Sequence, residues 1–219
     1  MNKSPLISVA ILNYNREQFL DRSLRSCTDQ ILFNKSYEIL FIDDCSTDNS
    51  ISKLKSLNIS NIRIFKNAKN MGAGFSSNLA VRKSRGKYFI RVDSDDYINK
   101  FSLQYLSDIL DNNDNIGFVC SDHFRVNEKG YKEDLIQLNS LNKIKNHGAG
   151  IMFRRSSILA VNNYNPKLRE AEDYSLVSEM VKKKIKYFYF PIPLYRYYIH
   201  GKNISLKGTR KNYIKKIKK

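Results

Sequence analysis

The chain has 219 residues, 42% of them hydrophobic, so it is long enough to bury a core as a single domain. It contains no apolar run of the roughly 18 residues needed to cross a membrane, and its N-terminus lacks the long apolar segment of a secretory signal, so we expect a cytoplasmic protein. The net charge of +17 lies mainly in the last forty residues, which hold thirteen Lys or Arg and no acidic residue. A nucleic-acid-binding domain would instead carry a basic stripe interleaved with the residues that recognise bases.

Short β-branched runs alternate with helical patterns in the first half of the chain, which is typical of βαβ units and predicts an α/β fold with a largely parallel sheet. The predicted strands are Ile7–Leu12, Tyr37–Ile42, Ile62–Phe65 and Tyr88–Val92. Asn15, with Gln18 three residues later, predicts a capped start for the first helix. Two further helices are expected, from about Ser50 to Leu57 and from Gly72 to about Ser84.

The second half should add a smaller β/α portion to this sheet. We expect a strand at Phe118–Ser121, a hairpin turn at Asn127–Gly130, and a close-approach loop at His147–Gly150. A helix is predicted at Tyr174–Lys182, followed by two short strands within Tyr187–Tyr198.

Three carboxylates fall within four residues directly after the fourth predicted strand, at Asp93, Asp95 and Asp96, with Ser94 between the first two. Charges this close repel one another and raise one another's pKa unless a cation neutralises them. A hard divalent ion with oxygen ligands is the usual partner, so the cluster predicts a metal site. A solvated loop or a helix cap is the alternative that the cluster by itself leaves open.

Polar residues also follow the first two predicted strands, at Tyr14 and at Asp43. Together with Asp93 they lie just past the carboxyl ends of three different strands, and open α/β sheets bind ligands at that edge. The sequence therefore predicts a ligand site assembled from several strands.

Several segments, in this order, resemble the motifs of the family 2 glycosyltransferases of the GT-A fold: Ser8–Arg16, Ile42–Asp48, Asn70–Gly72, Val92–Asp96, Glu172–Asp173 and Tyr195–His200. The resemblance covers nearly the whole chain. It implies a Rossmann-like, mostly parallel central sheet flanked by helices, with a small acceptor-side portion. Residues 1–206 would form a single domain, with a nucleotide-binding half at 1–98 and an acceptor-side half at 99–206, and residues 207–219 would be a basic tail.

The resemblance also implies a reaction: inverting transfer of a sugar from a nucleotide-sugar donor, most commonly a UDP-sugar, to a glycan or lipid-linked glycan acceptor. A divalent metal, Mn²⁺ or Mg²⁺, would neutralise the departing diphosphate, with Asp95 as its direct ligand and His200 as a further contact. Asp93 would hold the ribose or a metal-bound water, and Ser94 beside it is assigned to the same nucleotide-sugar site. For His200, a surface histidine in a C-terminal turn is the alternative.

Asp43 matches the base-recognition Asp of the family, with Tyr14 near enough to pack on the ring. Asp44 should have a structural role, because adjacent residues on an extended chain face opposite ways. Arg16 and Asn70 are candidate donors toward the base or the phosphates. Simple hydrogen bonding within the loops is the alternative for both.

Asp173 is the expected general base, which takes the proton of the acceptor hydroxyl, and Glu172 is the second candidate. The alternative for this pair is acidic charge that complements the dipole at the start of a helix. The chain departs from the resemblance at Ser77–Asn78, where the family often has Arg before the Asn. Arg91 could compensate only if it turns toward the site.

The basic tail Lys207–Lys219 carries Tyr213, Ile214 and Ile217 on one side of a candidate helix. It could lie on the anionic inner face of a membrane, which would make the protein peripheral there. A disordered solubilising tail and a nucleic-acid arm are the alternatives, although we expect no nucleic acid as a partner. Two rivals to a transferase remain: a catalytically silent module of the same fold, and a basic nucleic-acid-binding protein.

Overall fold

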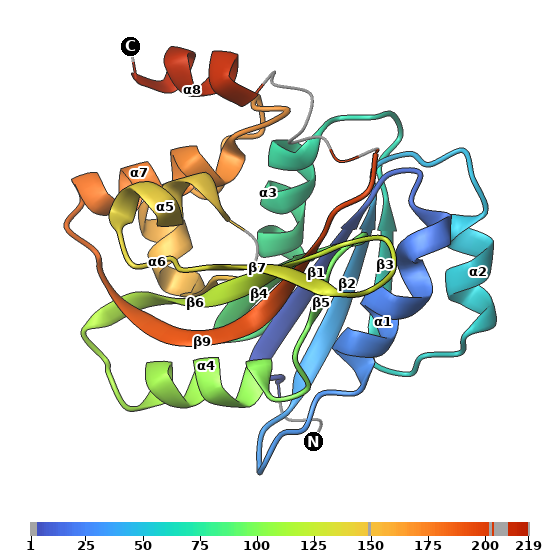
Figure 1. Cartoon of the computed structure of the whole chain (residues 1–219), viewed down its shortest axis with the longest axis horizontal. Coiled ribbons are helices and arrows are strands. Elements are labelled where there is room, and N and C mark those ends of the chain that lie inside the picture. The colour runs from blue at the N-terminus through green and yellow to red at the C-terminus, as the bar shows by residue number, and fades with distance from the viewer. Residues whose placement is uncertain (1–3, 149, 202, 204–209, 219) are drawn as a thin grey trace.

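The computed structural model describes residues 4–148, 150–201, 203 and 210–218. Within them, nine strands form one sheet (Figure 1). The strands are β1 (Ile7–Asn13), β2 (Tyr37–Asp43), β3 (Ile62–Lys66), β4 (Tyr88–Asp93), β5 (Tyr97–Ile98), β6 (Ile116–Val126), β7 (Lys132–Ile136), β8 (Met152–Arg154) and β9 (Lys186–Tyr198). The helices are η1 (Glu17–Phe19), α1 (Leu20–Thr28), α2 (Ser50–Ser56), α3 (Ala73–Lys83), α4 (Ser102–Asp111), α5 (Leu141–Asn146), α6 (Arg155–Ala160), α7 (Glu172–Lys182) and α8 (Arg210–Lys218).

The strand order is β3-β2-β1-β4-β8-β6-β9-β5, and β7 pairs with β6. The first four strands in this order are parallel. β8 joins them to β6 through two antiparallel pairings, β9 runs parallel to β6, and the short β5 pairs antiparallel with β9. The expected α/β fold is confirmed, with the parallel strands in the N-terminal half and a mixed portion after them.

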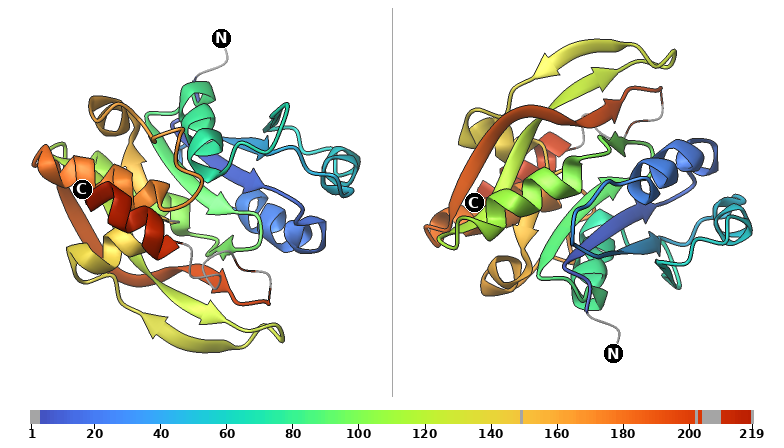
Figure 2. Two further views of the ribbon diagram at one scale, coloured as in Figure 1. Left: turned by 90° about the horizontal axis from the view of Figure 1, so that it is seen from above. Right: turned by 90° about the horizontal axis from the view of Figure 1, so that it is seen from below.

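Helices cover both faces of the sheet (Figures 1 and 2). The cluster of buried side chains on one face draws on α1, α2 and α4, and the cluster on the other face draws on α3, α5, α6 and α7. Successive residues of β1 alternate between these clusters, since Val9 and Ile11 belong to the first and Ala10 to the second. Burial on both faces explains why the central strands read as continuous apolar runs.

The four strands predicted in the first half are confirmed to within one residue at each end. The hairpin turn at Asn127–Gly130 joins β6 to β7 as expected. The close approach predicted for His147–Gly150 is also present, because a Cβ on Gly150 would lie 2.6 Å from Cδ2 of Tyr195. Gly150 has a φ of 76°, which only glycine adopts readily.

The predicted helix cap at Asn15 is wrong. Asn15 has a φ of 52°, and its Oδ1 accepts the N–H of Thr47 at 2.8 Å. The helical segment starts instead with η1 at Glu17, and Phe19 precedes α1 without a side-chain cap. The side chain that resembles a local cap therefore ties the loop after β1 to the loop after β2, a contact that local spacing cannot reveal.

The prediction of two short strands within Tyr187–Tyr198 is also wrong, because β9 is one continuous strand of 13 residues. Pro191 and Pro193 suggest a break, since proline cannot donate to a strand ladder. They lie where the register of β9 against β6 shifts, since Ser121 pairs with Phe190 and Asp122 pairs with Pro193.

The basic tail is helical where it is described. Lys207–Thr209 and Lys219 lie outside the described residues, and α8 lies against α7 (Figure 2). On α8, Tyr213, Ile214 and Ile217 are half-buried, whereas Lys211, Asn212 and Lys215 are exposed, which agrees with the predicted apolar side. None of the described helices combines the length and apolar content that a membrane-spanning helix needs.

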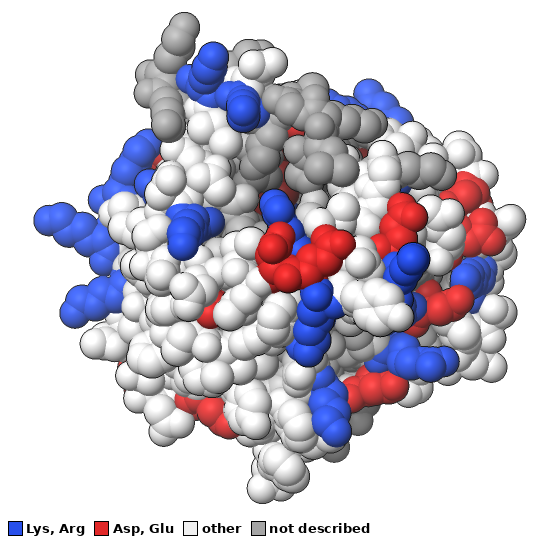
Figure 3. Space-filling view, viewed as in Figure 1, with Lys and Arg blue, Asp and Glu red and all other residues white. Residues whose placement is uncertain are grey.

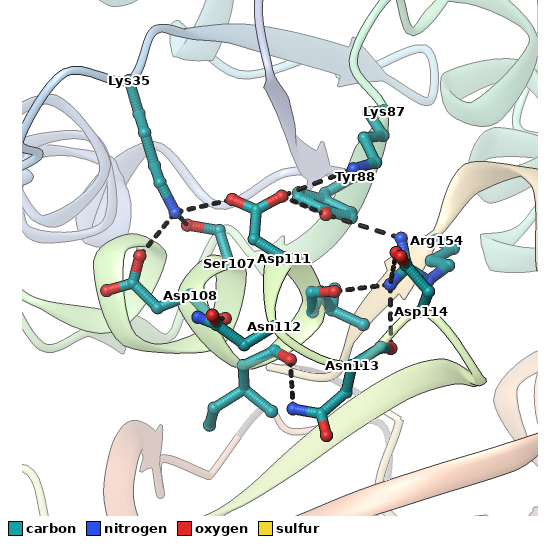
Figure 4. A network of polar contacts seen from close by, with 12 residues as sticks. Lys35, Lys87, Tyr88, Ser107, Asp108, Asp111, Asn112, Asn113, Asp114 and Arg154 are labelled. Carbon is teal, nitrogen blue, oxygen red and sulfur yellow. Dashed lines mark hydrogen bonds and ion pairs between the residues drawn. The ribbon is translucent and has the colours of Figure 1, made fainter.

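The C-terminal end of α4 is held by a network of cationic side chains (Figure 4). Nη2 of Arg154 donates to the carbonyls of Leu110 and Asn113 at 2.5 and 2.9 Å, and its Nε donates to the carbonyl of Ile116 at 2.8 Å. Lys35 Nζ lies 2.6 Å from Asp108 and 2.9 Å from Asp111. Positive charge at a helix C-terminus also complements the helix dipole, so this network fixes α4 against β8 and β6.

We predict that Arg154→Met lowers the free energy of unfolding by about 2–4 kcal/mol, because three carbonyls lose a charged donor. Lys87→Met is the matched control, since Lys87 is 52% exposed and lies 3.4 Å from Asp111. Lys87→Met should lower the free energy of unfolding by less than about 0.5 kcal/mol. Urea unfolding followed by circular dichroism measures both, and equal effects of the two substitutions would show that Arg154 does not hold α4.

Candidate active site

The carboxyl ends of β1, β2 and β4 meet at one edge of the sheet. Asn13 pairs with Asp43 in the β1–β2 register, and Leu12 pairs with Asp93 in the β1–β4 register. Ser46 ties two of these loops together, since its Oγ accepts from Nδ2 of Asn13 at 3.1 Å. The predicted convergence of polar residues from different strands is therefore confirmed.

Asp96 anchors the turn that follows β4. Its Oδ2 accepts the hydroxyl of Tyr195 at 2.7 Å, and its Oδ1 accepts the N–H of Tyr198 at 2.8 Å. The side chain is 1% exposed, and burial together with the charges of Asp95 and Asp93 raises the pKa of Asp96 well above its usual range. One carboxylate of the cluster thus has a structural role and fixes β9 beside the turn.

Asp95 lies between two cationic or potentially cationic groups. Its Oδ2 is 3.1 Å from Nε of Arg16 and 3.0 Å from Nε2 of His200. Burial by itself would raise the pKa of Asp95, but the hydrogen bond with His200 and the charge of Arg16 lower it below its usual value. Asp95 is therefore an anion at neutral pH.

His200 is held in place from several sides. It is 5% exposed, so the alternative of a surface histidine is wrong. Its ring centroid lies 4.3 Å from that of Phe19, and its backbone N–H donates to Oδ1 of Asn203 at 2.6 Å. These contacts point Nε2 at Asp95 without any movement of the ring.

The residues around Asp95 fit part of a metal site. Among the described residues, no group of three or more His, Cys, Asp or Glu side chains could by itself hold an ion. Asp95 and His200 nevertheless present a carboxylate oxygen and an imidazole nitrogen 3.0 Å apart. Divalent ions that bind phosphates are often held by only one or two protein ligands, with substrate oxygens and water as the others. The donor set therefore suits an ion shared with a diphosphate.

The loop after β2 shows two different carboxylates. Asp43 is 0% exposed, and its oxygens accept from Nδ2 of Asn13 at 3.1 Å and from the N–H of Ser46 at 3.0 Å. Asp44 accepts the N–H groups of Met71 at 2.8 Å and Gly72 at 2.7 Å, which fixes the start of α3. The structural role expected for Asp44 is confirmed. Base recognition by Asp43 stays a prediction.

Two other predicted residues lie on opposite sides of this edge. Tyr14 follows β1 and is 43% exposed, so its ring is open to a ligand. Ser94 is 2% exposed, and its N–H donates to the carbonyl of Leu12 at 3.1 Å, which places its backbone within the sheet edge.

Asn70 is covered by the loop that precedes α7. Its Oδ1 accepts from Nη2 of Arg169, and its carbonyl accepts from Nη1 of the same residue at 3.2 Å. A Cβ on Gly72 would lie 2.9 Å from the Cα of Arg169, so the two backbones are in close contact. Arg169 thus brings a cation to the loop that precedes α3.

Arg91 turns toward the site and joins three carboxylates. Its Nε is 3.1 Å from Oδ1 of Asp93, its Nη1 is 2.6 Å from Oε1 of Glu172, and its Nη2 is 2.8 Å from Oδ2 of Asp173. Burial by itself would lower the pKa of Arg91, but the charges of these carboxylates raise it well above its usual range. The buried guanidinium is therefore permanently charged, and Ser77 Oγ accepts a further bond from Nη1 at 3.3 Å.

Asp173 has one oxygen in use and one without a partner. Its side chain is 4% exposed, and Oδ2 is the atom that faces Arg91. Oδ1 is buried and has no hydrogen-bond partner in the described part of the chain. Only glycine fits at position 148, because a Cβ there would lie 1.8 Å from Cγ of Asp173. Gly148 therefore lies directly on this carboxylate.

Glu172 differs from Asp173 in its electrostatics. Burial and the neighbouring charge of Asp173 raise the pKa of Glu172 to about 7, although the charge of Arg91 acts in the opposite direction. Both residues start α7, so the dipole expected from the alternative interpretation is present as well. Arg91 on β4, however, contacts both carboxylates, so the pair does more than begin a helix.

The structure brings the predicted residues into two clusters, Arg16 with Asp95 and His200, and Asp93 with Glu172 and Asp173. Sequence reasoning missed that Arg91 links the second cluster and that Tyr195 supports the turn. A signal for Arg91 exists, since a charged residue inside an otherwise apolar strand needs buried partners. No local signal identifies Gly148 as the residue that covers Asp173.

Solved structures share this fold. TarS of Staphylococcus aureus in complex with UDP-GlcNAc matches with a TM-score of 0.76 at 22% identity, over 90% of this chain and 59% of the TarS chain. The mannosyltransferase PcManGT of Pyrobaculum calidifontis, in complex with GDP-Man and Mn²⁺, matches with a TM-score of 0.75 at 13% identity, over 100% of this chain and 66% of the other. The fold is therefore the GT-A fold.

Sequence relatives agree with the structural matches. An uncharacterized glycosyltransferase of Haemophilus influenzae is 30% identical over 228 residues, which cover 94% of this chain and 69% of that protein. The poly(ribitol-phosphate) β-N-acetylglucosaminyltransferase TarS is 33% identical over 106 residues, or 48% of this chain and 18% of TarS. The model of the family described as glycosyl transferase family 2 matches residues 8–161. The chain belongs to glycosyl transferase family 2.

Proposed function

We propose that this chain transfers a sugar from a nucleotide-sugar donor, a UDP-sugar, to a hydroxyl group of a glycan or lipid-linked glycan, with inversion at the anomeric carbon. The observation that carries the proposal is the carboxylate of Asp173. One of its oxygens is held by Arg91 at 2.8 Å, and the other is buried without a hydrogen-bond partner among the described residues. A buried carboxylate with an unused oxygen is suited to accept a proton.

Asp173 is the general base in this proposal. Its Oδ1 takes the proton of the acceptor hydroxyl while the hydroxyl oxygen forms a bond to the anomeric carbon. The bond from that carbon to the diphosphate breaks on the opposite face, so a single displacement inverts the configuration. Arg91 occupies Oδ2, which leaves Oδ1 as the oxygen that receives the proton.

The diphosphate would lie against the cluster of Arg16, Asp95 and His200. Asp95 and His200 would hold a divalent ion, Mn²⁺ or Mg²⁺, and this ion when bound would neutralise charge on the leaving diphosphate. Arg16 lies 3.1 Å from Asp95, so it would contribute positive charge to the same group. The Mn²⁺ in the PcManGT complex supports a divalent ion as the cofactor.

The nucleotide would occupy the edge formed by the loops after β1 and β2. Tyr14 is exposed there and would pack on the base, Asp43 would accept its imide N–H, and Asn70 would donate toward it. Asp93, whose side chain is 36% exposed, and the adjoining Ser94 would meet the ribose. The UDP and UDP-GlcNAc complexes of TarS support UDP as the nucleotide, while the GDP-Man complex of PcManGT keeps GDP as the second candidate.

The acceptor side would be residues 99–206, with the loop His147–Gly150 next to the base. TarS, by its name, glycosylates poly(ribitol-phosphate), which supports a glycan-type polymer as the acceptor. A catalytically silent module is disfavoured because Asp93, Asp95 and Asp173 are all present at the site. A nucleic-acid-binding role is disfavoured because the chain belongs to a transferase family.

We also propose that the exposed face of α8 binds an anionic membrane surface and brings the enzyme to lipid-linked acceptors. Lys211 and Lys215 are exposed on α8, and Lys182–Lys184 are exposed at the end of the neighbouring α7. Lysines near an anionic bilayer contribute about 1 kcal/mol each. Several lysines from adjacent helices would therefore give reversible binding.

Asp173→Asn should lower the transfer rate by about 10²–10⁴-fold, because the amide cannot take the proton. Nucleotide affinity should stay unchanged, since the base contacts the acceptor and not the donor. Transfer rates and calorimetric binding of UDP measure the two effects. Glu172→Gln is the matched variant. If Glu172→Gln loses transfer activity while Asp173→Asn transfers at the wild-type rate, Glu172 is the base.

Asp95→Asn should abolish the increase in nucleotide affinity that Mn²⁺ produces in the wild type, because the ion loses its carboxylate ligand. Calorimetric titrations of UDP and GDP, with and without Mn²⁺, test this. Asp114→Asn is the control, since that carboxylate is 92% exposed and remote from the site. Equal enhancement by Mn²⁺ in all three proteins would contradict the metal assignment, and no binding by the folded wild type would contradict the transferase proposal.

The double variant Lys211→Glu/Lys215→Glu should bind phosphatidylglycerol vesicles at least about tenfold more weakly than the wild type. The control is Lys129→Glu/Lys132→Glu, which makes the same charge change on the β6–β7 hairpin. Vesicle co-sedimentation at two salt concentrations measures binding, and phosphatidylcholine vesicles give the uncharged reference. Equal losses in the two double variants would show that net charge, and not α8, determines binding.

A further inference from the structure

Arg91 connects parts of the site that lie far apart in the sequence. It sits on β4 two residues before Asp93, and its other two carboxylates, Glu172 and Asp173, start α7. Residues i and i+2 of a strand share a face, so Arg91 and Asp93 project toward the same side of the sheet. The guanidinium is 5% exposed and contacts all three carboxylates at 2.6–3.1 Å.

A need for stability alone does not account for this arrangement. Apolar side chains of similar size usually join buried elements as well as an ion pair does or better, because charges lose their hydration on burial. Here one cation faces three carboxylates, so the cluster retains excess negative charge in a dry environment. Such clusters occur at sites where charge is needed for chemistry.

We propose that Arg91 is a positioning residue that couples the donor side of the site to the catalytic base. It holds Oδ2 of Asp173 so that Oδ1 is directed at the acceptor hydroxyl, and through Nε it joins that base to Asp93, which we assign to the donor. This inference rests on the proposed function, and it assigns to Arg91 a role beyond the donor-side compensation expected from the sequence.

The fork shape of the guanidinium is essential to this role. Nη1 and Nη2 of Arg91 donate hydrogen bonds to Glu172 and Asp173, and their directions are set by one rigid plane. Nε lies 3.1 Å from Oδ1 of Asp93 as an ion pair, without a hydrogen bond in the described part of the chain. A lysine ammonium is a single charge on a flexible stem and cannot hold two such partners in fixed directions beside a third charge. Arg91→Lys therefore keeps the positive charge and removes the alignment of the carboxylates. The variant separates the effect of charge from the effect of alignment.

Glu172 is the carboxylate of this cluster that responds to the loss of alignment. Burial and the charge of Asp173 already raise the pKa of Glu172 to about 7, and the charge of Arg91 acts in the opposite direction. A weaker contact with the cation should raise this pKa further, since an opposite charge within contact distance shifts a pKa by about 1–3 units. Because Glu172 shares Arg91 with the base Asp173, the protonation of Glu172 changes how Arg91 holds that base, and the acidic limb of the rate profile should move in the same direction.

The first experiment compares the wild type with Arg91→Lys in steady-state transfer between pH 5 and pH 9. We expect kcat to fall by about 10²-fold, because misplacement of a catalytic group by about 1 Å has effects of this size. We expect the KM of the donor to stay within about twofold, and the acidic limb to move to higher pH by about one unit or more. Arg63→Lys is the control, since Arg63 pairs with Glu38 at 2.8 Å at the other end of the sheet.

A second variant covers the case in which Arg91→Lys does not fold. Arg91→Met/Glu172→Gln removes one charge of each sign and leaves residue 173 an aspartate. It should show the same fall in kcat with a normal thermal unfolding temperature. A kcat within about twofold of the value for Glu172→Gln alone would overturn the inference.

A titration that needs no turnover separates this inference from the proposed function. ¹³C NMR of the labelled Glu carboxyl carbons, with Glu172→Gln for assignment, gives the pKa of Glu172 in each protein. An increase in Arg91→Lys supports the coupling. Wild-type turnover together with an unchanged titration and an unchanged pH profile in Arg91→Lys would leave Arg91 with only a structural role and overturn the inference. Absence of turnover in the wild type with every donor would instead count against the proposed function.

Discussion

The parallel register of β1 with β2 and β4 is the constraint on which the rest of the site depends. It sets Asn13 beside Asp43 and Leu12 beside Asp93, so the loops that follow three strands leave the sheet at one edge. Parallel strands end at the same edge, and their loops must therefore share space and hydrogen bonds. The bond from Asn13 to Ser46 and the bonds from Asp44 to the start of α3 are consequences of that crowding.

A second consequence is electrostatic. Four carboxylates of the site are largely removed from water, and each is compensated in its own way: Asp96 by the hydroxyl of Tyr195, Asp95 by Arg16 and His200, and Glu172 and Asp173 by Arg91. The pKa of Asp96 rises, the pKa of Asp95 falls, and the pKa of Glu172 moves to about 7. Environment, and not residue type, therefore divides these side chains into a structural anchor, an anion, and a glutamate whose pKa is about 7.

Much of the fold was predictable because its signals are local. Continuous apolar runs mark strands buried on both faces, and the alternation of strands with helices marks βαβ units. The predictions failed where a side chain serves a distant partner. Asn15 looks like a helix cap but bonds to the loop after β2, and Pro191 and Pro193 look like a break but lie at a shift in register. Spacing along the chain reveals neither the bond from the loop after β2 to Asn15 nor the register shift opposite the two prolines.

The sequence by itself determined the α/β class, the positions of the central strands, and the set of polar residues that follow them, because strand periodicity and turn chemistry are properties of neighbouring residues. Only the tertiary structure decided which of those residues meet. It brought His200 onto Asp95, it laid Gly148 on Asp173, and it turned Arg91 toward Glu172 and away from solvent. These contacts join segments separated by 25 to 105 positions, and their partners are set by the packing of the sheet and helices as a whole.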